Sequence, residues 1–198
     1  NGGPGAPAFV WAHPRHTDRF WQPLTGWLGH ATPFEFTPDY RPAAGIKRFV
    51  AGTPAMLSMA ALECGVDTLL AAEPLGGMAA LRKKSIALTE MFSALAAQRC
   101  GEFGVSVESP GAPELRGSQV SLSLADELDA ASYAVVQALI ARGVVGDFRA
   151  GRPNLLRFGF TPLYVGFAEV WDAVEHLRQV LASGEWKAAR FNQKAAVT

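Results

Sequence analysis

The stretch VSLSLADELDAASYAVVQALIARG, residues 120–143, changes its hydrophobic period once along its length. Its first five residues alternate between apolar and polar, which is typical of a strand with one buried face. From residue 131 onward, Val135, Val136, Leu139 and Ile140 follow helical spacing, and Gly143 is a stop signal. The stretch therefore predicts a half-buried strand followed by a helix.

Similar segments lie on both sides of this stretch. Short strands are predicted at 105–107, 144–145 and 155–160, and an amphipathic helix closes the chain with an apolar stripe between residues 167 and 181. The order strand, strand, helix, strand, strand, helix predicts an α+β sandwich. A long amphipathic helix over 77–99 precedes it, and we expect a domain boundary near Cys100.

The N-terminal part of the chain has a different character. Residues 13–52 are rich in proline, glycine and aromatic residues and show no clear period, which indicates an ordered loop region near a functional site. Thr53-Pro54 is a good N-cap followed by a proline favoured at the first helical position. A helix is therefore predicted over 53–71, and because it is apolar nearly all round, we expect it to be buried.

Composition limits the classes of function. The chain has 198 residues and a net charge of +0, which argues against nucleic acid as its main partner. With 49% hydrophobic and only 18% charged residues, much of its surface should be covered by a second subunit or by another segment. No apolar run is long enough to span a bilayer, so no membrane association is expected.

The cysteines and histidines show no metal-binding spacing. Cys64 and Cys100 lie in helical patterns, and we expect both to be buried thiols in a reducing cytoplasm. Of the histidines only His13 and His16 are close in sequence, so no metal site is predicted. The chain opens at Asn1 in a Gly/Pro loop, which suggests a fragment or a processed chain.

Three positions could carry binding chemistry, each with an alternative. The helix start at Thr53 could bind a phosphate, or Thr53 could cap only its own helix. Arg157, in an apolar strand, could clamp a substrate carboxylate, or pair with a protein acid such as Asp147. Trp27, in a glycine-flanked segment, could donate its indole N–H to a ligand, or be a core or interface aromatic.

Six dispersed segments point to one family: NGGPGAPAFVW (1–11), PLTGWLGH (23–30), GIKRFVAGTP (45–54), RGSQVS (116–121), RFGFTPLY (157–164) and EVWDAVEHL (169–177). Together these segments resemble kynureninases, and the closest likeness is to bacterial members. The resemblance implies a fold-type I enzyme that uses pyridoxal 5'-phosphate (PLP) and works as a cytoplasmic homodimer with active sites at the subunit interface. Its implied reaction, in tryptophan degradation, is hydrolysis of L-kynurenine or its 3-hydroxy derivative to the corresponding anthranilate and L-alanine.

The resemblance also implies an α/β organisation and roles for the three candidates. Residues 1–75 would end the large PLP-binding domain, residues 76–100 would be a connecting helix, and residues 101–198 would form the small α+β domain. Trp27 and Thr53 match positions that reach the cofactor phosphate, Thr53 across the dimer interface. Arg157 matches the arginine that holds the substrate α-carboxylate. Thr53, where some members have asparagine, favours L-kynurenine over the 3-hydroxy form.

The same resemblance places the cofactor lysine just before residue 1, so no catalytic residue is assigned within this chain and independent activity is not expected. The chain would need the N-terminal half of the enzyme. One alternative is another PLP enzyme of the same fold, such as a cysteine desulfurase or an aminotransferase. A desulfurase needs a cysteine in a mobile loop, which Cys64 and Cys100 do not match. Another alternative is a truncated, non-catalytic relative that binds only a partner chain.

Overall fold

The structure, a computed structural model, describes residues 5–193. The first four residues of the segment NGGPGAPAFVW lie outside the described residues. The chain divides into two compact units, the first ending at Ala71 and the second beginning at Ala72. Each unit is considered by itself below.

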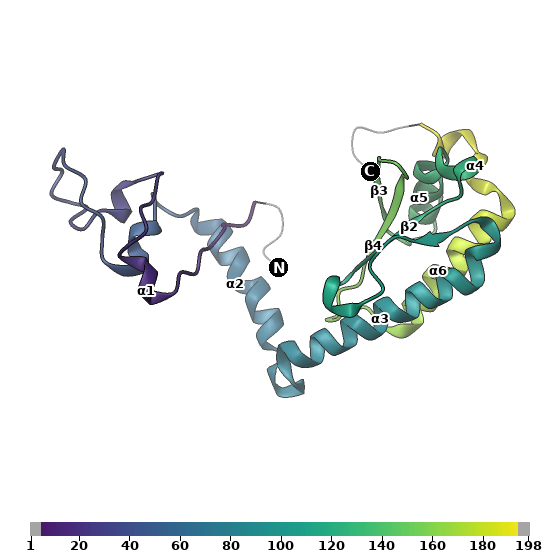
Figure 1. Ribbon diagram of the computed structural model, residues 1–198, viewed down its shortest axis with the longest axis horizontal. Helices are drawn as coiled ribbons and strands as arrows, with labels where there is room; N and C mark the ends of the chain where they lie inside the picture. Colours follow the sequence, from purple (N-terminus) through teal and green to yellow (C-terminus); the bar gives the residue numbers. More distant parts are fainter. Residues whose placement is uncertain (1–4, 194–198) are drawn as a thin grey trace. The chain divides into compact units, whose positions relative to one another are not determined.

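The second unit is built on a four-stranded antiparallel sheet with the order β1-β2-β4-β3 (Figure 1). The predicted strands at 105–107, 120–124 and 155–160 are confirmed with small shifts at their ends. The strand predicted at 144–145 is wrong, because Val145 is exposed and the pairing begins two residues later. The strands are β1 (Ser106–Val107), β2 (Gln119–Ser123), β3 (Asp147–Arg149) and β4 (Leu155–Gly159).

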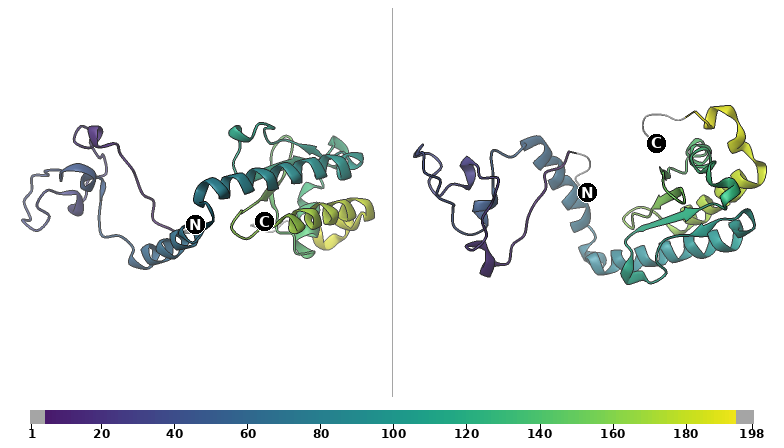
Figure 2. Two further views of the ribbon diagram at one scale, coloured as in Figure 1. Left: turned by 90° about the horizontal axis from the view of Figure 1, so that it is seen from below. Right: turned by 45° about the horizontal axis from the view of Figure 1, so that its top comes forward.

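Three longer helices pack against this sheet and form a single core with it. Helices α3 (Gly77–Cys100) and α6 (Phe167–Ser183) lie side by side, and α5 (Ser132–Ala141) contacts α6, β3 and β4 (Figures 1 and 2). The one-turn helix α4 (Asp126–Asp129) precedes α5. All three longer helices were predicted from their apolar spacing.

The core joins the helices to alternate residues of the two central strands. Phe92 of α3 is fully buried, and its ring centre lies 5.1 Å from that of Phe158 and 4.8 Å from that of Phe160. The segment predicted as a connector, 76–100, thus contributes buried side chains to this core. Cys100 is buried as predicted, and burial raises the pKa of its thiol to about 11. This thiol is therefore a poor nucleophile at neutral pH.

The first unit contains little buried surface of its own. Its elements are α1 (Pro14–Thr17), short 3-10 helices at Trp27–Gly29 and Gly45–Phe49, and α2 (Met56–Leu70). The loops between them are tied by backbone hydrogen bonds from Ala31 to Arg41 and from Ala43 to Gly29. The predicted loop region 13–52 is thus held by hydrogen bonds and by contacts between aromatic rings, without a buried core of its own.

Helix α2 departs from the sequence prediction in two ways. It begins at Met56, with Ala55 at the N-cap and no side-chain cap, so Thr53 does not cap it. It also buries none of its residues: Leu57 is 89% exposed, and Cys64 is exposed where a buried thiol was expected. The physical reason is that no other helix or strand of the described residues packs closely against this helix. No helix within residues 5–193 has the length and apolarity needed to cross a membrane.

Candidate functional site

The sheet of the second unit has one face packed on the helices and one open face. Successive residues of a strand point to opposite faces, and Leu156 and Phe158 of β4 enter the core. Arg157 therefore lies on the open face. Ser121 of β2 and Asp147 of β3 stand opposite Arg157 in the register. These three residues form one polar row across three neighbouring strands.

Arg157 forms an ion pair with Asp147, donating from Nη2 to Oδ2. This is the pairing that the sequence raised as the alternative to a ligand clamp. The pair does not use the whole guanidinium, because Nε of Arg157 is buried and has no partner within residues 5–193. A guanidinium carries five N–H donors, and leaving a buried donor unpaired costs about 1–3 kcal/mol. The open face thus holds a cation with an unused hydrogen-bonding edge.

Arg149 completes this group and was not singled out from the sequence. Its Nη2 lies 2.8 Å from Asp147 Oδ2, the same oxygen that accepts from Arg157. The sequence pattern that could have identified Arg149 is the alternation in Asp147-Phe148-Arg149, which places the two charged residues on one face of a strand. The group carries one negative and two positive charges, so its net charge is +1.

A loop beside β2 borders the polar row and is fastened by a buried arginine. Arg116 donates from Nη1 to the carbonyl oxygens of Pro110 and Gly111, and its side chain is only 6% exposed. Ser109 of the loop accepts a 2.9 Å hydrogen bond from the backbone N–H of Ser121. Arg116 opens the segment RGSQVS, but its role in holding the loop could not be read from the sequence.

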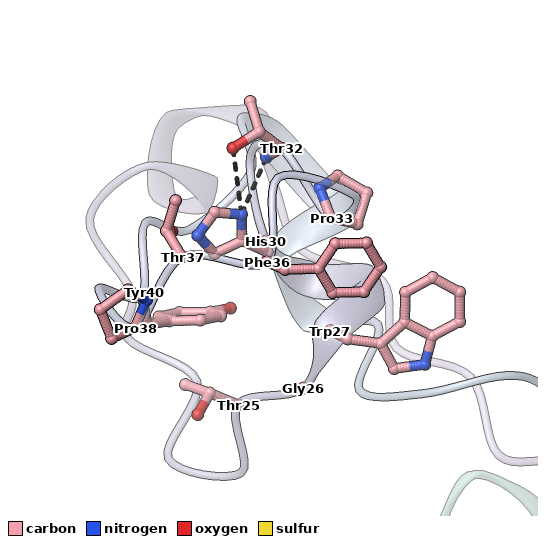
Figure 3. A pocket seen from close by; sticks show the side chains of 10 residues that line it. All are labelled: Thr25, Gly26, Trp27, His30, Thr32, Pro33, Phe36, Thr37, Pro38 and Tyr40. Atoms are coloured by element: carbon pink, nitrogen blue, oxygen red, sulfur yellow. Dashed lines mark hydrogen bonds between the residues drawn. The ribbon is translucent and has the colours of Figure 1, made fainter.

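Trp27 lies at the edge of a pocket of about 410 Å³ in the first unit. Its ring packs edge-on against Phe34 at a centroid distance of 5.6 Å. Figure 3 shows the indole nitrogen directed away from the other side chains of the pocket. An outward-facing N–H on a half-exposed ring can donate to an anion that approaches from outside the pocket.

The histidine of this pocket is already engaged on both ring nitrogens. His30 Nδ1 accepts from the backbone N–H of Thr32 at 2.9 Å (Figure 3). Its Nε2 lies 3.1 Å from the carbonyl oxygen of Asp39. These contacts fit the neutral ring with its hydrogen on Nε2, which then donates to Asp39. His30 is thus a structural residue of the pocket.

The segment before Thr53 packs closely on the Trp27 segment. A Cβ placed on Gly26 would come within 1.8 Å of the carbonyl oxygen of Ala51. This contact brings the chain on either side of Ala51 next to the short helix that carries Trp27, and Thr53 follows two residues later with an exposed side chain. Trp27 and Thr53 belong to the first unit, whereas Arg157 belongs to the second.

Metal-binding side chains do not gather anywhere within residues 5–193: no group of three His, Cys, Asp or Glu side chains could hold an ion. Cys64 lies in α2 and Cys100 ends α3, so neither occupies a loop.

Comparison with known proteins gives consistent matches. Residues 81–177 match the family model described as the kynureninase C-terminal domain. The whole chain is 48% identical to a kynureninase of Burkholderia mallei (strain SAVP1) and 45% identical to one of Pseudomonas fluorescens. In each case it covers 45% of the relative, so the chain spans about half the length of the curated relatives it matches.

Solved structures show the same fold at low sequence identity. A cysteine desulfurase from Thermococcus onnurineus NA1, in its apo form, has a TM-score of 0.64 at 17% identity, over 85% of this chain and 41% of that one. A mutant of C-DES with glycine covalently linked to its PLP cofactor has a TM-score of 0.60 at 21% identity, over 87% of this chain and 40% of that one. The predicted α/β fold of PLP-dependent fold-type I enzymes is thus confirmed.

Proposed function

Because the chain belongs to the kynureninase family, we propose that it is the C-terminal part of an enzyme that hydrolyses L-kynurenine, or its 3-hydroxy derivative, to the corresponding anthranilate and L-alanine. The observation that carries this proposal is Arg157, a cation on the open sheet face whose Nε has no partner within residues 5–193.

Arg157 would bind the α-carboxylate of the substrate through its unused guanidinium edge. A planar guanidinium binds a carboxylate through two parallel N–H···O bonds, which fix direction as well as distance. Fixing the amino-acid end of kynurenine orients the bond that breaks, the one between the β-carbon and the side-chain carbonyl carbon. Such positioning lowers the barrier because the orientation is achieved in the binding step.

The first unit would contribute to the binding of PLP. The Trp27 indole N–H faces outward and the Thr53 hydroxyl is exposed, so both groups fit donors to a phosphate. PLP, when bound, supplies an electron sink for negative charge formed on the amino acid. The lysine that bonds to the cofactor belongs, by resemblance, to the sequence that precedes residue 1 in relatives. We therefore infer that this chain alone is inactive.

The exposed apolar surface of α2 supports a partner for the first unit. An apolar helix is stable in water only when something covers it, and α2 buries none of its residues in its own unit. We infer that the remaining part of the enzyme and a second subunit cover it, in a cytoplasmic homodimer that acts in tryptophan degradation. A non-catalytic role as a partner-binding chain is the weaker reading, because the relatives are kynureninases over the full length of this chain.

The test uses the complete enzyme, meaning this chain together with the part that its relatives carry beyond it. With PLP and L-kynurenine it should release anthranilate, detected by fluorescence. Arg157→Ala should lower kcat/KM about 100-fold, because the hydrogen bonds to the charged carboxylate are lost. Arg152→Ala, an exposed arginine five residues away, is the control and should change little. Absence of anthranilate from the intact enzyme contradicts the proposed reaction, and unchanged kinetics of Arg157→Ala removes Arg157 from the site.

A further inference from the structure

Ser121 of β2 lies directly opposite Arg157 in the register, on the open face of the sheet. We propose that the Ser121 hydroxyl donates a hydrogen bond to the same carboxylate that Arg157 binds, and so gives the ligand a second point of attachment. This inference rests on the proposed function, since it adds a residue to the binding step assigned to Arg157.

The backbone hydrogen bonds of Ser121 determine how close its side chain comes to that of Arg157. Its carbonyl oxygen accepts from the N–H of Glu108 at 2.9 Å, and its N–H donates to Ser109 Oγ at 2.9 Å. Both groups therefore point toward the β1 side and away from β4. Ser121 and Arg157 are thus a pair without backbone hydrogen bonds between them. In antiparallel sheets such pairs have Cα atoms only about 4.5 Å apart, which brings the facing side chains closest.

The hydroxyl of Ser121 is held in a defined place and is not used by the protein. The two backbone hydrogen bonds fix the main chain of this residue, and with it the direction of its Cβ. Within residues 5–193 all hydrogen bonds of Ser121 are made by its backbone, so the hydroxyl can donate to a ligand. The residue is half-buried. A donor that is already positioned needs little reordering when the ligand binds.

A carboxylate can accept from this hydroxyl and from a guanidinium at the same time. Its two oxygens offer about four lone-pair sites, and an arginine fork occupies only two of them. Arg157 Nε is one such donor, without a partner in the described part of the chain. A serine hydroxyl adds another donor without bringing a second charge to the site. The ligand would then be held from two neighbouring strands, which restricts its rotation about the guanidinium.

The acid on the other side of Ser121 is directed along β2 and not across to Arg157. Glu108 is exposed and stands beside Ser121 on the β1 side. Its Oε1 accepts a 2.6 Å hydrogen bond from Oγ of Ser123, two residues farther along β2. The immediate neighbour of Arg157 on the β2 side is therefore a neutral hydroxyl. A carboxylate in that place would compete with the ligand for the guanidinium and repel it.

The test measures ligand binding to Ser121→Ala in the complete enzyme. The Kd of L-alanine, measured by NMR titration, should rise about tenfold, because a hydrogen bond to a charged carboxylate is lost. The Kd of L-alaninamide, which has an uncharged amide in place of the carboxylate, should change less than about threefold, because a hydrogen bond to a neutral acceptor is weaker. The kcat/KM for L-kynurenine should fall by about the same factor as the Kd of L-alanine rises.

Two further variants separate the hydroxyl from the rest of the side chain. Ser121→Thr keeps a hydroxyl at the same strand position and should leave the Kd of L-alanine within about threefold of the wild-type value. Ser106→Ala is the matched control. It removes an exposed serine of β1 that pairs with Ser123, one row away from Arg157, and should leave the Kd unchanged.

Four outcomes would overturn the inference. They are an unchanged Kd of L-alanine in Ser121→Ala, equal weakening of L-alanine and L-alaninamide, an equal rise in Ser121→Thr, and an equal rise in Ser106→Ala. If the intact enzyme binds L-alanine but does not hydrolyse kynurenine, the proposed function alone is contradicted. The alanine titrations, which need no hydrolysis, would still decide the role of Ser121 in that case.

Discussion

Gly26 lies so close to the carbonyl group of Ala51 that no side chain fits between them. A Cβ at position 26 would lie 1.8 Å from the Ala51 oxygen and 2.4 Å from its carbonyl carbon. Both of these neighbours are backbone atoms, which cannot rotate away as the end of a long side chain can. The glycine that precedes Trp27 is therefore required by packing against the segment that leads to Thr53.

Gly26→Ala should destabilise the first unit by about 1–3 kcal/mol, the usual cost of forcing an extra carbon into a closed contact. In the complete enzyme this should appear as a lower Tm and weaker retention of PLP, because Trp27 and the 50–53 segment move apart. Gly52→Ala is the matched control, since a Cβ there has no atom within 4 Å. Equal Tm values for the two variants would show that the contact with Ala51 is not restrictive.

For single residues, the sequence predicted which side chains need a partner better than it predicted the partners themselves. Arg157 had to be paired because it interrupts an apolar strand, and the ion pair with Asp147 is present. Arg149 was missed because its role depends on a register that places Arg157 opposite Asp147, and register is a property of paired strands. The capping role of Thr53 is wrong, because the helix begins three residues later.

Among the helices, α3 and α6 are joined by a charged group at their contact. Glu175 of α6 accepts hydrogen bonds from Arg178 and Gln179 on its own helix and from Arg99 of α3. These bonds, that of Arg178 first, hold the pKa of the Glu175 carboxyl well below its ordinary value of 4.5. The Arg99 guanidinium also stacks on the ring of Trp171, 4.6 Å from its centroid.

Glu175→Gln should make the second unit less sensitive to acid. A carboxyl whose pKa is lowered on folding contributes stability that is present above its unfolded pKa and lost as the pH falls through the folded value. The stability difference between wild type and Glu175→Gln should therefore be largest at neutral pH and shrink as the pH falls below about 4.5. Urea unfolding at a series of pH values measures this. Asp172→Asn, which changes an exposed acid on the same helix, is the control. If the free energy of unfolding depends on pH in the same way in both variants, the hydrogen bonds of Glu175 do not stabilise the contact between the helices.

The elements themselves were predictable to different degrees. Helices α3, α5 and α6 and strands β2 and β4 carry apolar residues at the period of their structure, which is a local signal. Strand β3 was misplaced because its Asp147 and Arg149 face the open side, whereas the apolar pair Val144-Val145 that suggested a strand does not pair. Its position is set by the neighbouring strand and not by its own composition.

For the whole molecule, the two units differ in how they are held together. The second unit has a continuous core from α3, α5, α6 and the sheet, whereas the first has an apolar helix with no buried residue. The low share of charged residues, 18%, predicted that part of the surface is covered in the working protein. Only the structure could show that α2 leaves its apolar residues uncovered within its own unit, because the sequence pattern of an apolar helix is the same whether the helix is covered or not.

Hydrogen exchange on this chain alone should therefore be uneven. Amides of α2 should exchange fast, because its hydrogen bonds are not protected by packing, and those of α3 and α6 should exchange slowly. In the complete enzyme α2 should become protected by at least about 100-fold while α3 changes little. Mass spectrometry of peptides from the two helices gives both values. Slow exchange of α2 in the isolated chain would contradict this prediction, because it would mean that the helix is already protected without the rest of the enzyme.

Because side chains alternate between the two faces of β4, this strand both contributes to the core and places Arg157 on the open face. Leu156 and Phe158 build the hydrophobic interior, and Arg157 between them faces the opposite side. Inserting or deleting one residue in this strand would exchange these positions, so that the Arg157 guanidinium would enter the core and Leu156 and Phe158 would turn toward water. Natural variation should therefore tolerate substitutions here far more readily than changes of length, because a shift of one residue would displace Arg157 and the two core residues together.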